Sequence, residues 1–229
     1  MKLRKIVVIT FLFATLAAQA KNKVVYGIDN RLDLYETEST LFLDLAESTA
    51  AMIDSGRISE VEDDMMSITG TALSERGICS TARFANQITA ASCSGFLVAP
   101  NLLVTAGHCI TSQSDCNSYK WVFGYANDTE DKATYLVEKS NVYSCKRIID
   151  QELDRRSKDD YALIELTRSV DDREPLEFRT EGRVEDETPL VVIGHSSGLP
   201  TKVADGAWVR NNMNDVYFSA NLDTFGGNS

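Results

Sequence analysis

The sequence predicts an all-β protein made of two β units, with a helical segment before them. From Cys79 onward, short runs rich in β-branched and aromatic residues alternate with turn residues, as in sandwiches and barrels. A charged stretch over residues 169–187 interrupts these runs, so we expect a first unit at 78–168 and a second at 188–229. The chain has 229 residues, 43% of them hydrophobic, which suffices for a buried core.

The first 20 residues have the features of a secretory signal peptide. Three basic residues precede an apolar run over 6–18, and Ala18, Gln19 and Ala20 supply a small-x-small cleavage pattern. The run is shorter than the roughly 20 apolar residues that span a bilayer, which argues against a membrane anchor. We therefore predict a secreted or periplasmic protein.

The rest of the chain is strongly acidic. Cleavage after Ala20 removes three basic residues and no acidic residue, so the formal net charge changes from −11 to −14. This charge argues against nucleic acid or an anionic membrane surface as a partner. No later segment is apolar over enough residues to predict a membrane span.

Residues 21–77 predict a separate N-terminal segment. A short strand at 24–27 precedes apolar residues at helical spacing over 36–56, and Gly56 can end that helix. The acidic stretch 57–77 predicts a linker or surface, because a run of charges is more often solvated than bound to calcium.

The strongest functional signal is the segment from Cys93 to His108 and Cys109. Two apolar runs joined by Ala-Pro-Asn predict a hairpin, and Thr-Ala-Gly-His-Cys follows it. The segment resembles the histidine region of trypsin- and chymotrypsin-like serine proteases, whose T-A-A-H-C motif differs here only at Gly107. The resemblance implies that His108 is a general base. A Cys93–Cys109 disulfide would hold this loop and contribute about 3 kcal/mol in the chain-entropy model.

A second segment, residues 159–166, resembles the aspartate region of the same proteases. Asp160 stands directly before the predicted strand and matches their aspartate, which orients the histidine and stabilises its charged form. Asp159 is the competing candidate, although its position in the register fits less well.

The segment 223–229 resembles the nucleophile region of these proteases, with Ser229 as the nucleophile. Backbone N–H groups of Gly227 and Ser229 would form the oxyanion hole. The order histidine, aspartate, serine is the order of this fold, and it differs from the orders in subtilisin and α/β-hydrolases. The resemblance therefore implies a two-barrel, chymotrypsin-like fold and peptide hydrolysis through an acyl-enzyme.

The closest resemblance is to bacterial glutamyl endopeptidase-like members. Asn228 replaces the aspartate of trypsin-like enzymes, and residues 26–31 are similar to the G-x-D-[DN]-R start of the glutamyl group. Thr224 matches a threonine of their specificity pocket. The start motif implies that the N-terminal segment stays with the mature fold. The alternative is a pro-region that is cut after Arg76.

The other histidine and the cysteines complete the sequence-based expectations. His195 does not match a pocket histidine, and we expect a loop residue that shapes the second barrel. Two histidines and cysteines of disulfide type predict no metal site, and no cofactor is expected. Export favours disulfides, and we expect Cys116 to pair with Cys145. An odd cysteine, Cys79, is then free or paired with a residue beyond the printed sequence.

We conclude from the sequence that this is a secreted serine endopeptidase acting on a protein or peptide substrate. Strands follow the nucleophile in the family, so we expect the second barrel to be truncated after Ser229. Open edges and an uncovered core would then make the second half fold poorly and hydrolyse peptides poorly. The alternatives are an inactive truncated fragment and a non-catalytic binding protein on the same fold.

Overall fold

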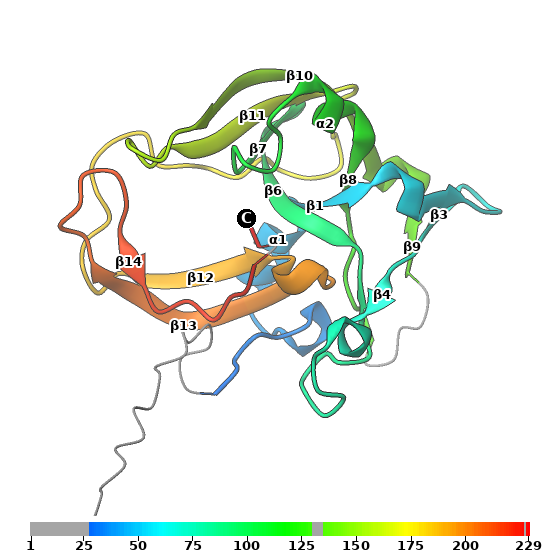
Figure 1. Cartoon of the computed structure of the whole chain (residues 1–229), viewed down its shortest axis with the longest axis horizontal. Helices are drawn as coiled ribbons and strands as arrows, with labels where there is room; N and C mark the ends of the chain where they lie inside the picture. The colour runs from blue at the N-terminus through cyan, green and yellow to red at the C-terminus, as the bar shows by residue number, and fades with distance from the viewer. Residues whose placement is uncertain (1–27, 130–134, 227) are drawn as a thin grey trace, which may run out of the picture.

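A closed six-stranded barrel forms the larger part of the molecule (Figure 1). The computed structural model describes residues 28–129, 135–226, 228 and 229. Neighbouring barrel strands follow the order β1-β6-β7-β11-β10-β8 and pair antiparallel. Their bounds are β1 Thr49–Asp54, β6 Ala91–Ala99, β7 Leu102–Thr105, β8 Tyr119–Phe123, β10 Val142–Leu153 and β11 Asp160–Leu166. The all-β prediction is confirmed.

Large apolar side chains fill the barrel. Leu97 and Leu103 from the β6–β7 hairpin pack with Trp121 and Phe123 of β8 and Ile164 of β11, and all five are fully buried. A second cluster around Tyr125 and Tyr135 lies between the barrel and the sheet β2-β3-β9. The strands of that sheet are β2 Ile58–Glu60, β3 Met65–Ile68 and β9 Tyr135–Glu138.

The helix predicted over 36–56 is much shorter in the structure. After the 3-10 turn η1, Leu34–Glu36, helix α1 covers only Thr40–Glu47, and β1 begins at Thr49. The first five residues of β1 are buried between β6 and β8, so pairing on both sides outweighs the helical spacing of the same residues. The barrel therefore starts well before residue 78, where we placed its boundary.

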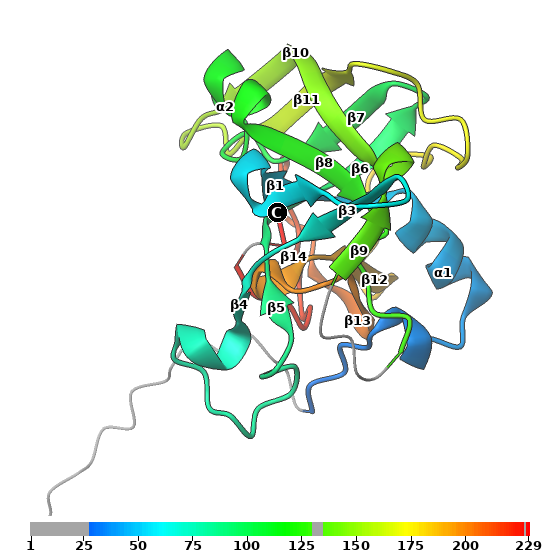
Figure 2. The same cartoon turned by 90° about the vertical axis from the view of Figure 1, so that its right-hand side faces the viewer.

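The predicted linker at 57–77 also contains strands. Besides β2 and β3, it holds β4 Thr71–Ala72, which pairs with β5 Ile88–Thr89, and the 3-10 turn η3 Leu73–Arg76. Figure 2 shows α1 on one side of the molecule and the β4–η3 region on the other. The strand expected at 24–27 and the signal peptide lie outside the described residues.

A three-stranded sheet, β12-β13-β14, lies below the barrel in Figure 1, and the chain reaches Ser229 between the two. Its strands are β12 Pro189–Gly194, β13 Lys202–Asn211 and β14 Ser219–Ala220, with the turn η5 Ser196–Gly198 between β12 and β13. Residues 169–187, all described, contain no helix or strand and connect the barrel to this sheet.

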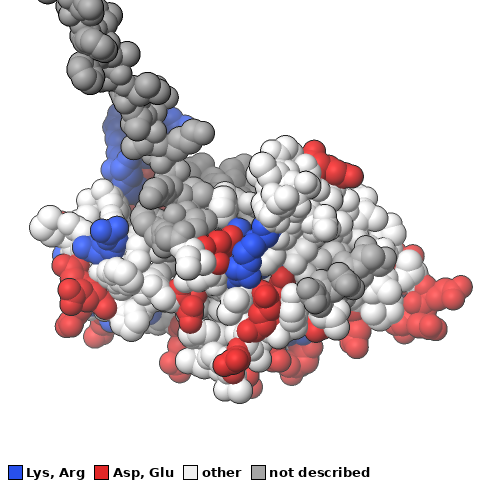
Figure 3. Space-filling view, turned by 90° about the horizontal axis from the view of Figure 1, so that it is seen from below, with Lys and Arg blue, Asp and Glu red and all other residues white. Residues whose placement is uncertain are grey.

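Acidic side chains are spread over the face seen in Figure 3, and basic side chains form small separate groups.

The remaining elements are α2 Gln113–Ser118 and the short turns η2 Ser55–Arg57 and η4 Lys139–Asn141. Among the described residues, no helix is long and apolar enough to cross a bilayer.

The N-terminal segment is built into the lower sheet through a buried ion pair. Backbone bonds join Leu32 to Val203 of β13, and Lys202 Nζ lies 2.5 Å from Asp33 Oδ1. Both side chains are at most 2% exposed. The Gln87 side chain hydrogen-bonds to both members of the pair: Oε1 accepts from Lys202 Nζ at 2.8 Å, and Nε2 donates to Asp33 Oδ2 at 2.7 Å. Burial lowers the pKa of Lys202 to about 8, although Asp33 acts in the opposite direction.

We predict that Lys202→Met lowers the free energy of unfolding by about 3 kcal/mol, because it leaves the Asp33 carboxylate buried without its cation. Urea unfolding followed by fluorescence measures this change. The matched control is Lys139→Met, which removes an ion pair with Glu60 whose members are 51% and 58% exposed. An equal effect of both substitutions would contradict the structural role of the buried pair.

Candidate active site

The loop that carries His108 follows the β6–β7 hairpin and is held by a disulfide. Cys93 of β6 and Cys109 are bonded across a sequence separation of 16 residues, with 6.3 Å between their Cα atoms. The expected Cys116–Cys145 disulfide is also present, and it ties α2 to β10. Cys79 is exposed and has no disulfide partner among the described residues.

Gly107 is required by the close approach of β10 to this loop. A Cβ atom at this position would overlap the carbonyl oxygen of Glu152, near the end of β10. Gln151 Nε2 donates to the Gly107 carbonyl at 3.0 Å and fixes the same contact. The change from Ala to Gly in the histidine motif therefore suits the local packing.

Asp160 opens β11 and bonds His108 twice. His108 Nδ1 lies 2.8 Å from Asp160 Oδ2, and the His108 backbone N–H donates to Asp160 Oδ1 at 2.9 Å. The pKa of the Asp160 carboxyl is below its usual value: burial acts to raise it, but the bonds from His108 lower it more. The competing candidate, Asp159, directs its backbone N–H to Ser157 Oγ at 3.3 Å. It is Asp160 that contacts the histidine.

Ser229 is exposed and is anchored through its backbone. Its carbonyl accepts a hydrogen bond from the N–H of Ser94 on β6. The preceding side chain, Asn228, packs so closely on Gly194 that a Cβ there would lie 2.5 Å from Asn228 Oδ1. Ser229 and Asp160 line one recess of about 510 Å³ between the barrel and β12. Among the described residues, no hydrogen bond joins the Ser229 hydroxyl to the His108 ring, and Gly227 lies outside them.

The family is decided by a sequence comparison: the family described as "Trypsin-like peptidase domain" matches residues 93–229, more than half of the chain. This chain belongs to the trypsin-like peptidase family. No curated protein matches the sequence.

Three solved protease structures show a distant similarity to this chain, with TM-scores below 0.5. The Rv3671c protease in an inactive form is 13% identical, with a TM-score of 0.47, over 86% of this chain and 75% of that one. A serine-to-alanine mutant of Rv3671c from M. tuberculosis H37Rv, also inactive, is 11% identical, with a TM-score of 0.46, over 85% and 72%. The Vibrio cholerae VesB protease is 16% identical, with a TM-score of 0.46, over 78% of this chain and 44% of that one.

In this trypsin-like peptidase, an arginine that the sequence analysis did not single out holds the loop before Ser229. Arg31 is 5% exposed and pairs with Asp29 at 2.7 Å. Its guanidinium lies over two rings, 5.0 Å from Phe84 and 4.3 Å from Phe225. Because Phe225 is four residues before Ser229 in the sequence, Arg31 connects the N-terminal segment to this part of the chain. In the sequence, the similarity of residues 26–31 to a family start motif was the signal that could have pointed to Arg31.

The neighbouring Thr224, expected in a specificity pocket, is half-buried. Its hydroxyl oxygen is buried and has no hydrogen-bond partner among the described residues. A buried hydroxyl without a partner carries an energetic cost that a bound polar group can relieve. The next residues are also fixed, because Ser197 N–H donates to the Gly226 carbonyl at 2.8 Å.

His195 is a buried part of the framework. It is fully buried after β12, and its ring stacks on Tyr125 with 5.7 Å between centroids. The backbone N–H of His195 donates to Ser94 Oγ at 2.9 Å, and Nδ1 lies 3.2 Å from the Leu199 carbonyl. Burial lowers the pKa of His195 to about 4, although the Leu199 bond acts to raise it.

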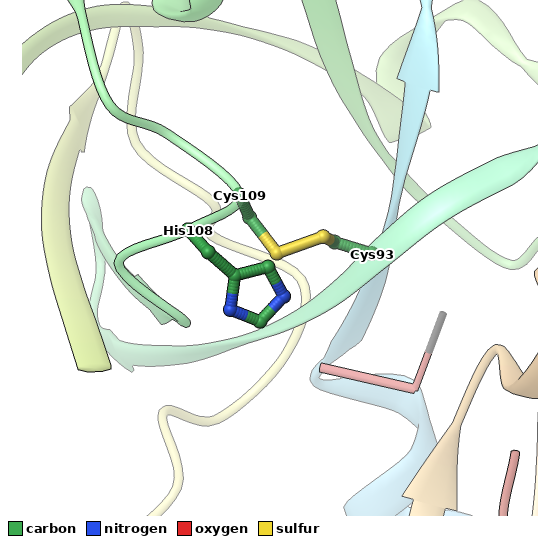
Figure 4. Close-up of side chains that lie close together, drawn as sticks. All are labelled: Cys93, His108 and Cys109. Carbon is green, nitrogen blue, oxygen red and sulfur yellow. A yellow bond between two sulfur atoms is a disulfide. The ribbon is translucent and has the colours of Figure 1, made fainter. Parts of the chain in front are cut away.

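Figure 4 shows the His108 ring beside the Cys93–Cys109 disulfide. One ring nitrogen and the two sulfur atoms all lie within 4.8 Å of one another. Sulfur atoms that are joined as a disulfide offer no thiolate, so these three residues do not form a thiolate metal site. The disulfide instead forms part of the surface around the histidine.

We predict that stability decreases as pH is lowered from 6.5 to about 4, because the unfolded chain binds a proton at His195 that the folded chain excludes. The pKa difference corresponds to about 3 kcal/mol. Unfolding midpoints in urea, measured across this pH range, test the slope. His195→Phe keeps an aromatic ring against Tyr125 and should flatten the slope, whereas His108→Ala should retain it. An unchanged slope in His195→Phe would contradict the assignment.

Proposed function

We propose that this chain is a secreted serine endopeptidase in which Ser229 is the nucleophile, His108 the general base and Asp160 the residue that orients the base. The single observation that carries the proposal is the pair of hydrogen bonds from His108 to Asp160. With a backbone bond and a ring bond to the same carboxylate, the imidazole has a defined orientation. It is then prepared to accept a proton at its other nitrogen.

The proposed reaction follows from this orientation. Asp160 accepts the Nδ1–H, so Nε2 of neutral His108 has a lone pair and takes the proton from the Ser229 hydroxyl. The Ser229 oxygen attacks the peptide carbonyl, and backbone N–H groups of Ser229 and Gly227 stabilise the resulting oxyanion. His108 returns the proton to the leaving amine, and water then hydrolyses the acyl-enzyme.

Two further features support finer parts of the proposal. The two disulfides agree with an exported protein, because disulfides persist in oxidising compartments. The unpartnered hydroxyl of Thr224 agrees with a role in a pocket that takes a polar side chain, as expected for a glutamyl endopeptidase-like enzyme. Secretion and preference for glutamate are proposals on these grounds.

A fluorophosphonate probe, which labels activated serines, tests the proposed nucleophile on the full chain. We expect labelling at Ser229, located by mass spectrometry of the digested protein, and loss of labelling in Ser229→Ala. Asp160→Asn should slow labelling by about 10⁴-fold, because the histidine loses its correct tautomer. Hydrolysis of casein followed by mass spectrometry of the products then tests for endopeptidase activity.

Matched controls come from other residues of the same type. Asp159→Asn and Ser219→Ala should leave the labelling rate unchanged, because neither side chain has a role in the proposed reaction. Labelling that is absent from the folded protein would overturn the proposal and favour a non-catalytic binding protein. Strong labelling would support the proposal and would refute the expectation from the sequence that truncation makes this chain react poorly.

A further inference from the structure

A second, polar recess is lined in part by Gly226, three residues before Ser229. It has a volume of about 480 Å³ and is separate from the recess that Asp160 and Ser229 line. Its walls come from η2, the β4–β5 pair, the start of β6, η5 and the nucleophile segment. The lining residues used below are Arg57, Arg76, Thr89, Ser92, Ser197 and Gly226.

Two arginines are directed into this recess by backbone carbonyls. Arg57 Nη1 donates to the Thr89 carbonyl at 3.0 Å, and Arg76 Nη1 donates to the Ser197 carbonyl at 2.9 Å. The Thr89 and Ser197 carbonyls are close neighbours, because the residues that follow them are in contact. The Ala90 N–H donates to the Gly198 carbonyl, and a Cβ atom on Gly198 would lie 3.4 Å from Thr89 Cβ. A guanidinium has five N–H groups, so each arginine retains donors for a ligand.

The two arginines are exposed residues in a chain that has 34 acidic and 23 basic residues. Within the described part of the chain, however, neither Arg57 nor Arg76 forms an ion pair with a carboxylate. Figure 3 shows how widely the acidic residues spread over one face. Two cations without ion-pair partners in one recess favour an anionic ligand.

The recess is within reach of a peptide bound at Ser229. Ser92 lies two residues before Ser94, whose N–H bonds the Ser229 carbonyl, and two strand residues span about 7 Å. Gly226 lies three residues before Ser229 on the other wall. The recess is therefore close enough for a side chain one to three residues from a bond that reacts at Ser229 to reach it.

The position of the histidine indicates which half of the substrate this is. His108 protonates the leaving amine, so the departing half lies on its side of Ser229. Cys93, next to Ser92 of the recess, carries the disulfide whose sulfur atoms lie within 4.8 Å of a ring nitrogen of His108. Along β6, the order Ser94, Cys93, Ser92 runs from the Ser229 contact past the disulfide beside His108 to the recess, which favours the side of the departing half.

We propose that the recess binds the carboxylate of an aspartate or glutamate located one to three residues C-terminal to the scissile bond. Arg57 and Arg76 bind that carboxylate, and the hydroxyl groups around them complete the site. This inference rests on the proposed peptidase function and names a selectivity determinant for it. A guanidinium pairs with a carboxylate through parallel N–H···O bonds, which gives geometric as well as electrostatic selection.

Digestion of a peptide library by the full chain, with cleavage sites read by mass spectrometry, tests the position. We expect enrichment of Asp and Glu within the three positions after the scissile bond. Two peptides from the best site, identical except for Glu or Gln at the enriched position, then give kcat/KM. The glutamate peptide should be favoured about five- to tenfold, as befits a partly exposed ion pair with two cations.

Variants separate the recess from general electrostatics. Arg57→Gln and Arg76→Gln should each reduce the ratio of kcat/KM for the glutamate peptide to that for the glutamine peptide towards unity, and Arg76→Lys should retain part of the preference. Arg183→Gln is the matched control: it removes the same charge from an exposed arginine that pairs with Asp215, and the preference should persist. Thermal unfolding checks that each variant is folded.

The outcomes distinguish this inference from the proposed function. Labelling of Ser229 without an acidic preference after the scissile bond, or with a preference before it, overturns the inference and leaves the function standing. Folded Gln variants that keep the full preference also overturn it, because the arginines then only hold the two carbonyls. If Ser229 is not labelled, fluorescence polarisation measures whether the full chain binds a fluorescein-labelled Ala-Glu-Glu-Ala peptide. Binding that needs both arginines supports an acid-binding recess, and its absence overturns the recess together with the enzyme.

Discussion

Ser94 of β6 makes the contact on which the arrangement of the site depends. Its backbone N–H bonds the Ser229 carbonyl, and its hydroxyl accepts the N–H of His195 at the end of β12. One residue of the barrel thus fixes both the nucleophile segment and the lower sheet. The residue before it, Cys93, fixes the histidine loop through the disulfide, and Ser92 lines the arginine recess. Because β6 is an interior strand of a closed barrel, these attachment points share one rigid support.

The His108–Asp160 contact and both disulfides were predictable from the sequence, whereas the bounds of the N-terminal elements were not. The histidine segment was readable because hairpin, motif and cysteines lie within 17 consecutive residues, and local sequence sets all of them. β1 was misread as helix because its residues keep an apolar spacing that suits either element, and only the partners β6 and β8 decide. Contacts such as Ser94 with Ser229 join residues more than a hundred positions apart, and no local pattern encodes them.

His195 shows the same limit in a single residue. From the sequence it was a loop residue, since Gly-His-Ser-Ser-Gly has the composition of a turn. In the structure it does follow β12, yet it is fully buried against Tyr125. Burial, which depends on packing between the two units, sets its charge state. A neutral ring stacks there without bringing an unpaired charge into the interior. The residue type was visible in the sequence, and its role depended on the tertiary environment.

The N-terminal segment supplies the last element of the argument. Asp33 pairs with Lys202 of β13, and Arg31 lies between Phe84 and Phe225, so the segment contacts both the lower sheet and the loop before Ser229. Arg83, next to Phe84, bonds the Asp29 carbonyl at 2.7 Å and extends the same attachment. Arg31 therefore contributes to the position of Phe225 although it lies nearly 200 residues earlier in the chain. These contacts, which start at Asp29, make the segment part of the folded unit around Phe225.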